Sequence, residues 1–397
     1  MSFRTKIQFL CLVLTVVLCL SACLPKPQDS GVVDGEVTTE NFSPATDKGE
    51  SSEIGQKYAT LSALVDSGEK VIKAIDTDFE YKEVSGGVKI TKYKGEYKSE
   101  EKDDYIILSI PEEIGGKSVV SIGKEAFAIV AHLDALIIPD SVTAIDNLAF
   151  YGCNYLTYLQ LGQNTNLIGD YAFAMCPSLY KVDLSFAESI GLGAFIGCDS
   201  LNTVTLSFIG GTREENSYLG YIFGASGVEF NKEFVPNSLR NVILNDKVTN
   251  IPDLAFYNCK YITSVTIPDS VISIGVRAFY KCRSIVEIDT GNGVKAISDD
   301  AFFGCDSMKS IKLSPSLESL GMQAFLGCTA LEDVKIPAKL TEIKASAFYG
   351  CASLKNIDLA NVKTIGKDAF CGCETLTPPD ISHVENIAEG NDNLNKQ

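Results

Sequence analysis

Histidine and tryptophan are almost missing from this chain of 397 residues, which has two histidines, His132 and His383, and no tryptophan. Histidine is the side chain that most often transfers protons or binds metals near neutral pH, so its scarcity argues against acid–base and metal chemistry. Basic residues are also in short supply, with 34 Lys and Arg against 51 Asp and Glu and a formal charge of −17. Because an acidic chain repels phosphate backbones, the sequence predicts no nucleic-acid binding.

The chain also lacks a long hydrophobic run, since the apolar stretch at 7–20 is too short for a comfortable membrane span. It follows the basic residues Arg4 and Lys6, which is the arrangement of a secretory signal. The next residues, Leu-Ser-Ala-Cys at 20–23, resemble a bacterial lipobox. That resemblance implies a signal peptide at 1–22, lipid on Cys23, and an exported protein held at the cell envelope, surface-exposed, through the lipid anchor only. The alternative is an ordinary cleaved signal in which the cysteine is incidental.

The residues after the signal change in composition. Residues 23–56 are rich in Pro, Ser, Thr, Gly and acids and hold few large apolar side chains, so we expect a lipidated, disordered tether. An N-terminal cap with the first strands is expected at 57–118, and a repeat solenoid at 119–381. An insertion is expected near 207–238, and a C-terminal cap at 382–397.

An Ala-Phe pair returns along the chain at nearly constant spacing. Successive phenylalanines are 22 or 23 residues apart, except for one gap of 61 residues between Phe195 and Phe256. We interpret Phe223, inside that gap, as a divergent member of the series, with the extra residues looped out as a tolerated loop or as a binding insertion. Self-similarity at this period is typical of a solenoid. The phenylalanines of the series are Phe127, Phe150, Phe173, Phe195, Phe256, Phe279, Phe302, Phe325, Phe348 and Phe370.

Each repeat has the same internal order, as "LEDVKIPAKLTEIKASAFYGC" at 331–351 illustrates. Its first residues alternate between apolar and polar, which predicts a short strand with one face inward. A second apolar pair, Leu340 and Ile343, precedes the Ala-Phe pair, and Cys351 follows it. One such unit has no closed core of its own, so we expect the units to stack and bury a continuous core.

The repeat resembles the bacterial BspA-like leucine-rich repeat family. The resemblance rests on "DSVTAIDNLAFYGCNYL" (140–156), "SVISIGVRAFYKCRSI" (270–285), the strand "LEDVKIP" (331–337) and the insert "YLGYIFGAS" (218–226). It implies an α/β-type or mostly β solenoid, an arc of about eleven units with short parallel strands on one face. It also implies a surface role, with adhesion attributed to some members of the family.

The chain has 13 cysteines, most of them at one phase of the repeat. We favour a ladder of buried thiols that pack as small apolar groups. Disulfides between turns are the alternative, because an exported chain can be oxidised. Metal binding or catalysis is disfavoured, because a column offers a line of ligands rather than a tetrahedron. The nine in-phase cysteines, each three residues after a repeat phenylalanine, are Cys153, Cys176, Cys198, Cys259, Cys282, Cys305, Cys328, Cys351 and Cys373.

The remaining candidate is a surface. Side chains on either side of the central apolar residue of each strand should point outward. Neither histidine has a catalytic partner in sequence, and we predict no catalytic residue, cofactor or metal site, which disfavours an enzyme. The favoured function is protein–protein interaction or adhesion to host or extracellular-matrix components, and the alternative is a structural or spacer protein of the envelope with no dedicated ligand. The predicted partner-binding surface comprises Tyr158, Gln160, Lys181, Asp183, Thr203, Thr205, Asn241, Ile243, Glu287, Asp289, Lys312 and Lys335.

Overall fold

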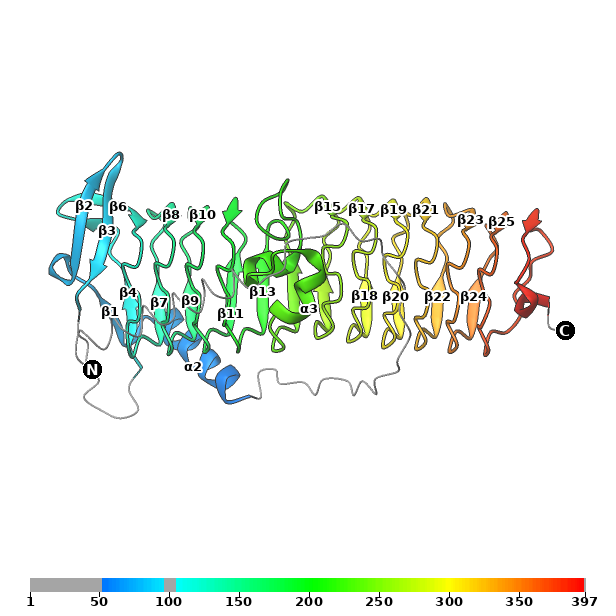
Figure 1. The fold of residues 1–397 in the computed structure, drawn as a ribbon, viewed down its shortest axis with the longest axis horizontal. Coiled ribbons are helices and arrows are strands. Elements are labelled where there is room, and N and C mark those ends of the chain that lie inside the picture. Colours follow the sequence, from blue (N-terminus) through cyan, green and yellow to red (C-terminus); the bar gives the residue numbers. More distant parts are fainter. Residues whose placement is uncertain (1–51, 96–104, 396–397) are drawn as a thin grey trace. The chain divides into compact units, whose positions relative to one another are not determined.

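The computed structural model describes residues 52–95 and 105–395. The predicted signal peptide, Cys23 and nearly all of the predicted tether lie outside the described residues. The described part is the predicted solenoid, of about 12 turns, and successive turns lie side by side in Figure 1.

One column of parallel strands carries the alternating segments of the repeat. The strands pair in register from one turn to the next, for example Val182 with Val204 and Val204 with Val242. They form an eight-stranded sheet followed by a four-stranded sheet. We call the outward side of this first column the strand face. Its strands are β1 (Val71–Lys73), β4 (Ile107–Ser109), β7 (Ala135–Ile137), β9 (Tyr158–Gln160), β11 (Lys181–Leu184), β13 (Thr203–Leu206), β14 (Asn241–Leu244), β16 (Ser264–Thr266), β18 (Glu287–Asp289), β20 (Ser310–Lys312), β22 (Asp333–Lys335) and β24 (Asn356–Asp358).

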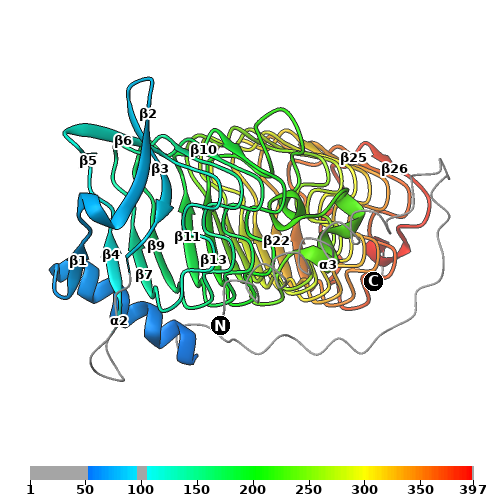
Figure 2. The same ribbon diagram turned by 60° about the vertical axis from the view of Figure 1, so that its left-hand side comes forward.

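A second column of parallel strands runs along another side of the coil, as Figure 2 shows. Apart from β6, each of its strands has two residues and contains the second residue of the second apolar pair. The sequence pattern predicted strands on one face only, because the two-residue strands of the second column are too short to show an alternating pattern. The second column comprises β6 (Lys117–Ile122), β8 (Ala144–Ile145), β10 (Leu167–Ile168), β12 (Ser189–Ile190), β15 (Asn250–Ile251), β17 (Ser273–Ile274), β19 (Ala296–Ile297), β21 (Ser319–Leu320), β23 (Glu342–Ile343), β25 (Thr364–Ile365) and β26 (Asn386–Ile387).

The repeat phenylalanines form the centre of the core. All ten are fully buried, and on either side of the insertion they stack on their neighbours with ring centroids 4.9–5.5 Å apart. Aromatic pairs at this distance add about 0.5–1.5 kcal/mol each beyond their buried area. Each turn therefore depends on its two neighbours, as expected of a solenoid.

Two left-handed residues per turn reverse the chain around each phenylalanine. The residue before Ala-Phe has positive φ, as at Ser346 (54°), and so does the residue before the cysteine, as at Gly350 (71°). Left-handed backbone costs an L-residue about 1–2 kcal/mol but costs glycine nothing. This explains the Gly of "AFYGC", whereas the position before Ala-Phe is held by non-glycine residues in most turns.

The insertion lies between β13 and β14, which pair directly despite it. It contains the short helices η2 (Leu219–Phe223), η3 (Val228–Phe230) and α3 (Asn231–Phe234). Phe223 is fully buried, and the amide of Phe195 donates to Ile222 O at 2.9 Å, just as the amide of Phe173 donates to Ala194 O. Phe223 thus takes the place of the missing repeat phenylalanine, as its spacing suggested.

The N-terminal end of the core is closed by an antiparallel hairpin of β2 (Phe79–Val84) and β3 (Gly87–Tyr93). Strand β3 pairs in parallel with β6, the first strand of the second column, while β5 (Glu113–Ile114) pairs antiparallel with β6. The ring of Tyr93 stacks on Phe127 at 5.0 Å, so a tyrosine extends the phenylalanine column where the Ala-Phe pair is absent. The short helix η1 (Asp76–Asp78) joins β1 to the hairpin.

The C-terminal end is closed by amide side chains. In the turns before it, a phenylalanine N–H donates to the residue before the next phenylalanine; here Phe370 N–H donates to Asn391 Oδ1 at 3.1 Å. Asn391 is buried and also donates to Gly366 O and Ala388 O. Asn393, in the terminal helix η4 (Asp392–Asn395), donates from Nδ2 to Phe370 O at 3.0 Å. These amides replace the backbone of a further turn.

Helix α2 (Glu53–Ser67) was not predicted from the sequence, and it begins inside the segment assigned to the disordered tether. The hydroxyl of Ser52 accepts from Gly55 N–H at 3.0 Å and caps its first turn. Gly68 ends it with φ of 71°. The tether boundary at residue 56 is therefore too late by about one helical turn, because an N-cap serine resembles the serines of the tether.

Candidate functional site

The strand face presents two outward side chains from each strand. From β4 to β24 the central residue of each strand is buried, as Val182, Val242 and Ile311 illustrate, while its neighbours point out. From β16 to β24 both neighbours are exposed, whereas on β13 and β14 they are half-buried. The predicted residues therefore lie on one face as expected, but they do not form one uniform surface.

Helix α2 covers the N-terminal part of the strand face (Figure 1). Leu61 is fully buried against Ile107 and Ala135, which are outward residues of β4 and β7. The ring of Tyr58 stacks on Tyr158 at 5.5 Å and lies 5.3 Å from the ring of Tyr180. Tyr158, predicted to be free for a partner, instead packs partly against a helix of its own chain. The sequence gives no sign of this contact because the two tyrosines belong to distant segments.

An ion pair fixes the start of this helix. Lys57 Nζ lies 2.7 Å from Asp134 Oδ1, and the side chains are 21% and 11% exposed. The other carboxylate oxygen of Asp134 accepts from Ile106 N–H at 3.0 Å. If helix α2 docked elsewhere, the shielded carboxylate of Asp134 would lose its partner and leave an uncompensated charge, which is costly. The pair therefore specifies where the helix docks.

A groove of about 220 Å³ lies beside helix α2, over β9 and β11. Its lining includes four predicted surface residues, Tyr158, Gln160, Lys181 and Asp183, and the structure therefore brings these four together. Burial, reinforced by the neighbouring Tyr158, raises the pKa of Tyr58 to about 12, so its hydroxyl stays neutral at physiological pH. The groove also includes residues that the sequence analysis did not select, namely Tyr58, Leu159, Leu161 and Phe186.

The insertion borders a second, more open depression of about 590 Å³. Its lining is mostly charged and includes Glu188, Arg213, Glu214, Glu215 and Lys247. Arg213 Nη1 donates to Lys247 O at 2.8 Å, which ties the loop to the turn after β14. The side chains of 213–215 are exposed, as expected of a loop that projects from a solenoid.

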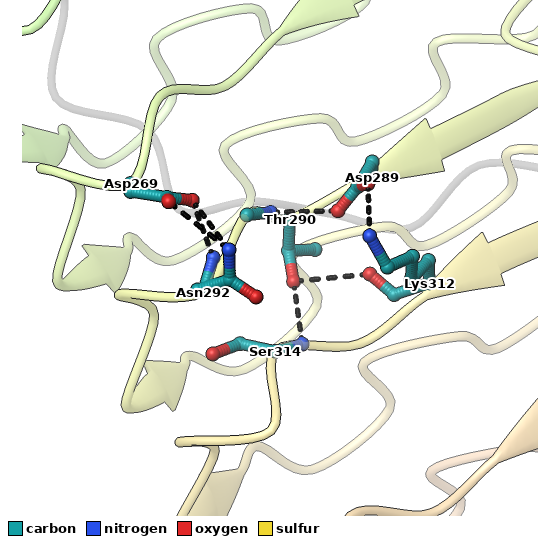
Figure 3. Close-up of polar contacts among 7 residues, drawn as sticks. Asp269, Asp289, Thr290, Asn292, Lys312 and Ser314 are labelled. Carbon is teal, nitrogen blue, oxygen red and sulfur yellow. Dashed lines mark hydrogen bonds and ion pairs between the residues drawn. The ribbon is translucent and has the colours of Figure 1, made fainter.

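The C-terminal part of the strand face is open and of mixed charge. Lys312 Nζ lies 2.6 Å from Asp289 Oδ2, and this hydrogen bond raises the pKa of Lys312. Hydrogen bonds from Asn292 lower the pKa of Asp269. Figure 3 shows these contacts joining three successive turns, together with the hydroxyl of Thr290, which accepts from Ser314 N–H at 2.8 Å. Such exposed pairs add little stability, but they order side chains along the face.

The in-phase cysteines form the expected buried column, and all ten described cysteines are free thiols. Cys305 Sγ donates to Phe279 O of the preceding turn at 3.2 Å, and eight of the nine repeat this contact. Cys259, the first cysteine of the column after the insertion, instead lies 4.0 Å from Tyr257 O. Burial raises the pKa of Cys198 and Cys373 to about 12. The column is thus built for packing, since a reactive cysteine needs a lowered pKa.

Neither histidine lies in a catalytic arrangement among the described residues. His132 is an exposed turn residue with φ of 58°, and its ring stacks on Tyr155 at 4.9 Å. His383 Nε2 hydrogen-bonds with Leu359 O at 2.9 Å in the C-terminal cap. Within 52–95 and 105–395, no group of three or more His, Cys, Asp or Glu side chains could hold a metal ion. In the same residues no helix has both the length and the apolar character to cross a membrane.

A short aromatic ladder on the outside of the coil was missed. The residue after each repeat phenylalanine except Phe173 is half-buried or exposed, and Tyr257, Tyr280 and Phe303 stack at 5.0 and 4.7 Å. The Tyr in "AFYGC" is the signal that marks this position. The ring of Tyr280 is stacked on both sides, whereas Tyr257 and Phe303 each have one stacked neighbour.

A family comparison assigns the repeat. The BspA type leucine-rich repeat region matches residues 109–216 and 249–377 in six copies, which is more than half of the chain. The chain belongs to this BspA-type family. Leucine-rich repeat solenoids of this kind are in general scaffolds for protein interaction rather than enzymes. The break between the two BspA-type matches falls on the insertion.

Several solved structures resemble this BspA-type chain at low identity. A leucine-rich repeat protein from Bacteroides ovatus is 20% identical, covering 80% of this chain and 99% of its own, with a TM-score of 0.31. A leucine-rich cell surface protein from Faecalibacterium prausnitzii is 22% identical, covering 81% and 96%, with a TM-score of 0.34. The pneumococcal vaccine antigen PcpA is 18% identical, covering 80% and 88%, with a TM-score of 0.33. No curated protein matches the chain.

Proposed function

We propose that this chain is a lipid-anchored surface protein that binds another protein, of the host, the extracellular matrix or the envelope, through the open part of its strand face. The observation that carries the proposal is the run of exposed side chains from β16 to β24, presented in register by a packed scaffold. A rigid array of this kind needs little reorganisation to bind, which lowers the cost of association. Adhesion to host or extracellular-matrix components is the more specific form of this proposal.

The mixed charges of the open face favour a protein partner. Glu287 and Asp289 on β18 are followed by Lys312 on β20 and Lys335 on β22, all exposed. A face with charges of both signs complements a partner of the opposite pattern, which sets the register of the complex more than its affinity. A nucleic acid would need a basic stripe, which this row does not supply.

The test is capture of a partner by the immobilised chain from envelope and host-matrix proteins. Glu287→Lys combined with Lys335→Glu should weaken capture at least tenfold. The control is Glu342→Lys, an exposed position on β23 in the second column. If both variants lose capture equally, the binding surface does not lie on the strand face. Reproducible absence of any partner would favour the spacer alternative.

The anchor is tested separately, because Cys23 lies outside the described residues. Cys23→Ser should abolish incorporation of a labelled fatty acid and release the protein from the membrane fraction. Label that survives the substitution would refute the lipobox interpretation. This outcome leaves the binding proposal standing, since the strand face does not include Cys23.

A further inference from the structure

The groove over β9 and β11 differs in chemistry from the rest of the strand face. Aromatic rings line it from two directions, Tyr58 and Tyr158 on the side of helix α2 and Phe186 from the turn after β11. Phe186 is 39% exposed, and Lys247 Nζ lies 5.6 Å from its ring centroid, so a ligand can contact the exposed part of the ring that Lys247 does not cover. From β16 to β24 the outward residues include no aromatic side chain. The groove is therefore a local site and not one section of a repeated surface.

The polar groups of the groove include both hydrogen-bond donors and acceptors. Gln160 offers an amide, Lys181 an ammonium group and Asp183 a carboxylate. Ser185 N–H donates to Asp183 Oδ1 at 2.9 Å, which orients that carboxylate on the strand. Lys181 and Asp183 are two residues apart on β11 and so share the outward face. Small-molecule sites combine apolar walls with a few placed polar groups in this way.

The two charged groups of the groove lining have opposite signs. Lys181 and Asp183 bring one positive and one negative group, so the pair carries no net charge that would select an anion or a cation. A neutral ligand with several hydroxyl groups can use both, because it accepts from the ammonium group while it donates to the carboxylate. An ion would be attracted by one of the two groups and repelled by the other.

The size of the groove narrows the ligand further. Its volume, about 220 Å³, lies below the roughly 300–1,000 Å³ of sites that enclose drug-sized molecules. It suits one small ring, with the remainder of a longer ligand in solvent. A sugar ring has both required features, an apolar C–H face that packs on aromatic rings and hydroxyl groups at its rim.

We propose that the groove between helix α2 and Phe186 is a binding site for a neutral sugar ring, taken as a free saccharide or as the exposed unit of a glycan. The site is separate from the protein-binding surface of β16–β24, so the two can fail independently. Tyr158 and Phe186 hold the ring between them, and Gln160, Lys181 and Asp183 select its hydroxyl groups.

The test is saturation-transfer NMR on the purified chain with glucose, galactose and N-acetylglucosamine, and with protonated glucosamine and N-acetylneuraminic acid as charged comparisons. At least one neutral sugar should receive saturation, and the charged sugars should receive less. Phe186→Ala should raise the dissociation constant of that sugar at least tenfold. Tyr349→Ala, at an exposed tyrosine elsewhere on the coil, should leave it unchanged.

Further variants separate recognition from misfolding. Tyr158→Phe keeps the ring and should retain binding, whereas Asp183→Asn should weaken it about fivefold or more. Circular dichroism should be unchanged in Phe186→Ala, which lies outside the contact with helix α2. The proposal is overturned if no neutral sugar binds, if Phe186→Ala and Asp183→Asn bind like the parent, or if the charged sugars or short basic peptides bind more tightly.

Discussion

The phenylalanine column predicts a large and local loss of stability when one ring is removed. Phe302 is fully buried, and its ring lies 5.0 Å from Phe279 and 5.4 Å from Phe325, nearly parallel to both. Removal of a buried phenylalanine to alanine costs about 3–5 kcal/mol. Because two stacked pairs are lost at once, we expect Phe302→Ala to fall in the upper half of that range.

Hydrogen exchange measured by mass spectrometry suits this prediction better than a single melting curve. Long repeat arrays depart from two-state unfolding, so one unfolding free energy for the whole chain is poorly defined. Phe302 N–H donates to Ala324 O at 2.8 Å and Phe279 N–H donates to Ala301 O at 2.7 Å. These amides should lose protection first, while those near Phe150 keep it.

The matched control is the next residue along the chain. Phe303 points outward, is half-buried, and stacks only on Tyr280 among the ring contacts of the described residues. Phe303→Ala should therefore cost about 1 kcal/mol, the value of one partly exposed aromatic pair. The reasoning is refuted if Phe302→Ala costs less than about 2 kcal/mol, or if protection falls evenly along the array.

Four further predictions follow from other contacts. Gln323→Gly should raise stability by up to about 1 kcal/mol in urea unfolding, because φ at Gln323 is 56°, whereas Lys309→Gly should lower it. Asp134→Ala should weaken docking of helix α2 by about 2–3 kcal/mol and speed proteolysis after that helix; an unchanged rate would contradict the role of the ion pair. In the native chain Cys371 alone among the ten repeat-region thiols should react quickly at pH 8, and all ten should react after unfolding without reductant; far fewer would indicate disulfides. Because Tyr58 has a raised pKa of about 12, the undocked form ionises first, so docking should be complete below pH 10 and weaken as pH rises from about 10 to 12; absorbance titration of Tyr58→Phe should lose one late-ionising tyrosine.

The parts of the fold that repeat could be predicted, because each turn supplies the same information again. Phe223 illustrates this well, since its spacing alone placed it in a column whose other members are far more regular. The cysteine column followed from the same argument. A single residue in isolation would have carried neither conclusion.

The parts that occur once could not be predicted. Tyr58 meets Tyr158 across about a hundred residues of sequence, and no periodicity links a helix to the face that it covers. The groove beside Phe186 is formed where helix α2 docks on the strand face, so only part of its lining could be predicted from the sequence. Asn391 and Asn393 were assigned to a polar cap, but their role as substitutes for backbone becomes visible only when the next turn is known to be absent.

Because these asparagines replace the backbone of a further turn, the C-terminal cap can end the array after any regular turn. Asn391 and Asn393 bind main-chain groups around Phe370 and Cys373 that every regular turn also presents. The cap therefore recognises main-chain groups of the last turn and does not depend on the side chains of that turn. An array of this kind can gain or lose whole turns ahead of the cap while the same cap still closes the core. The length of the solenoid can therefore change in steps of one repeat.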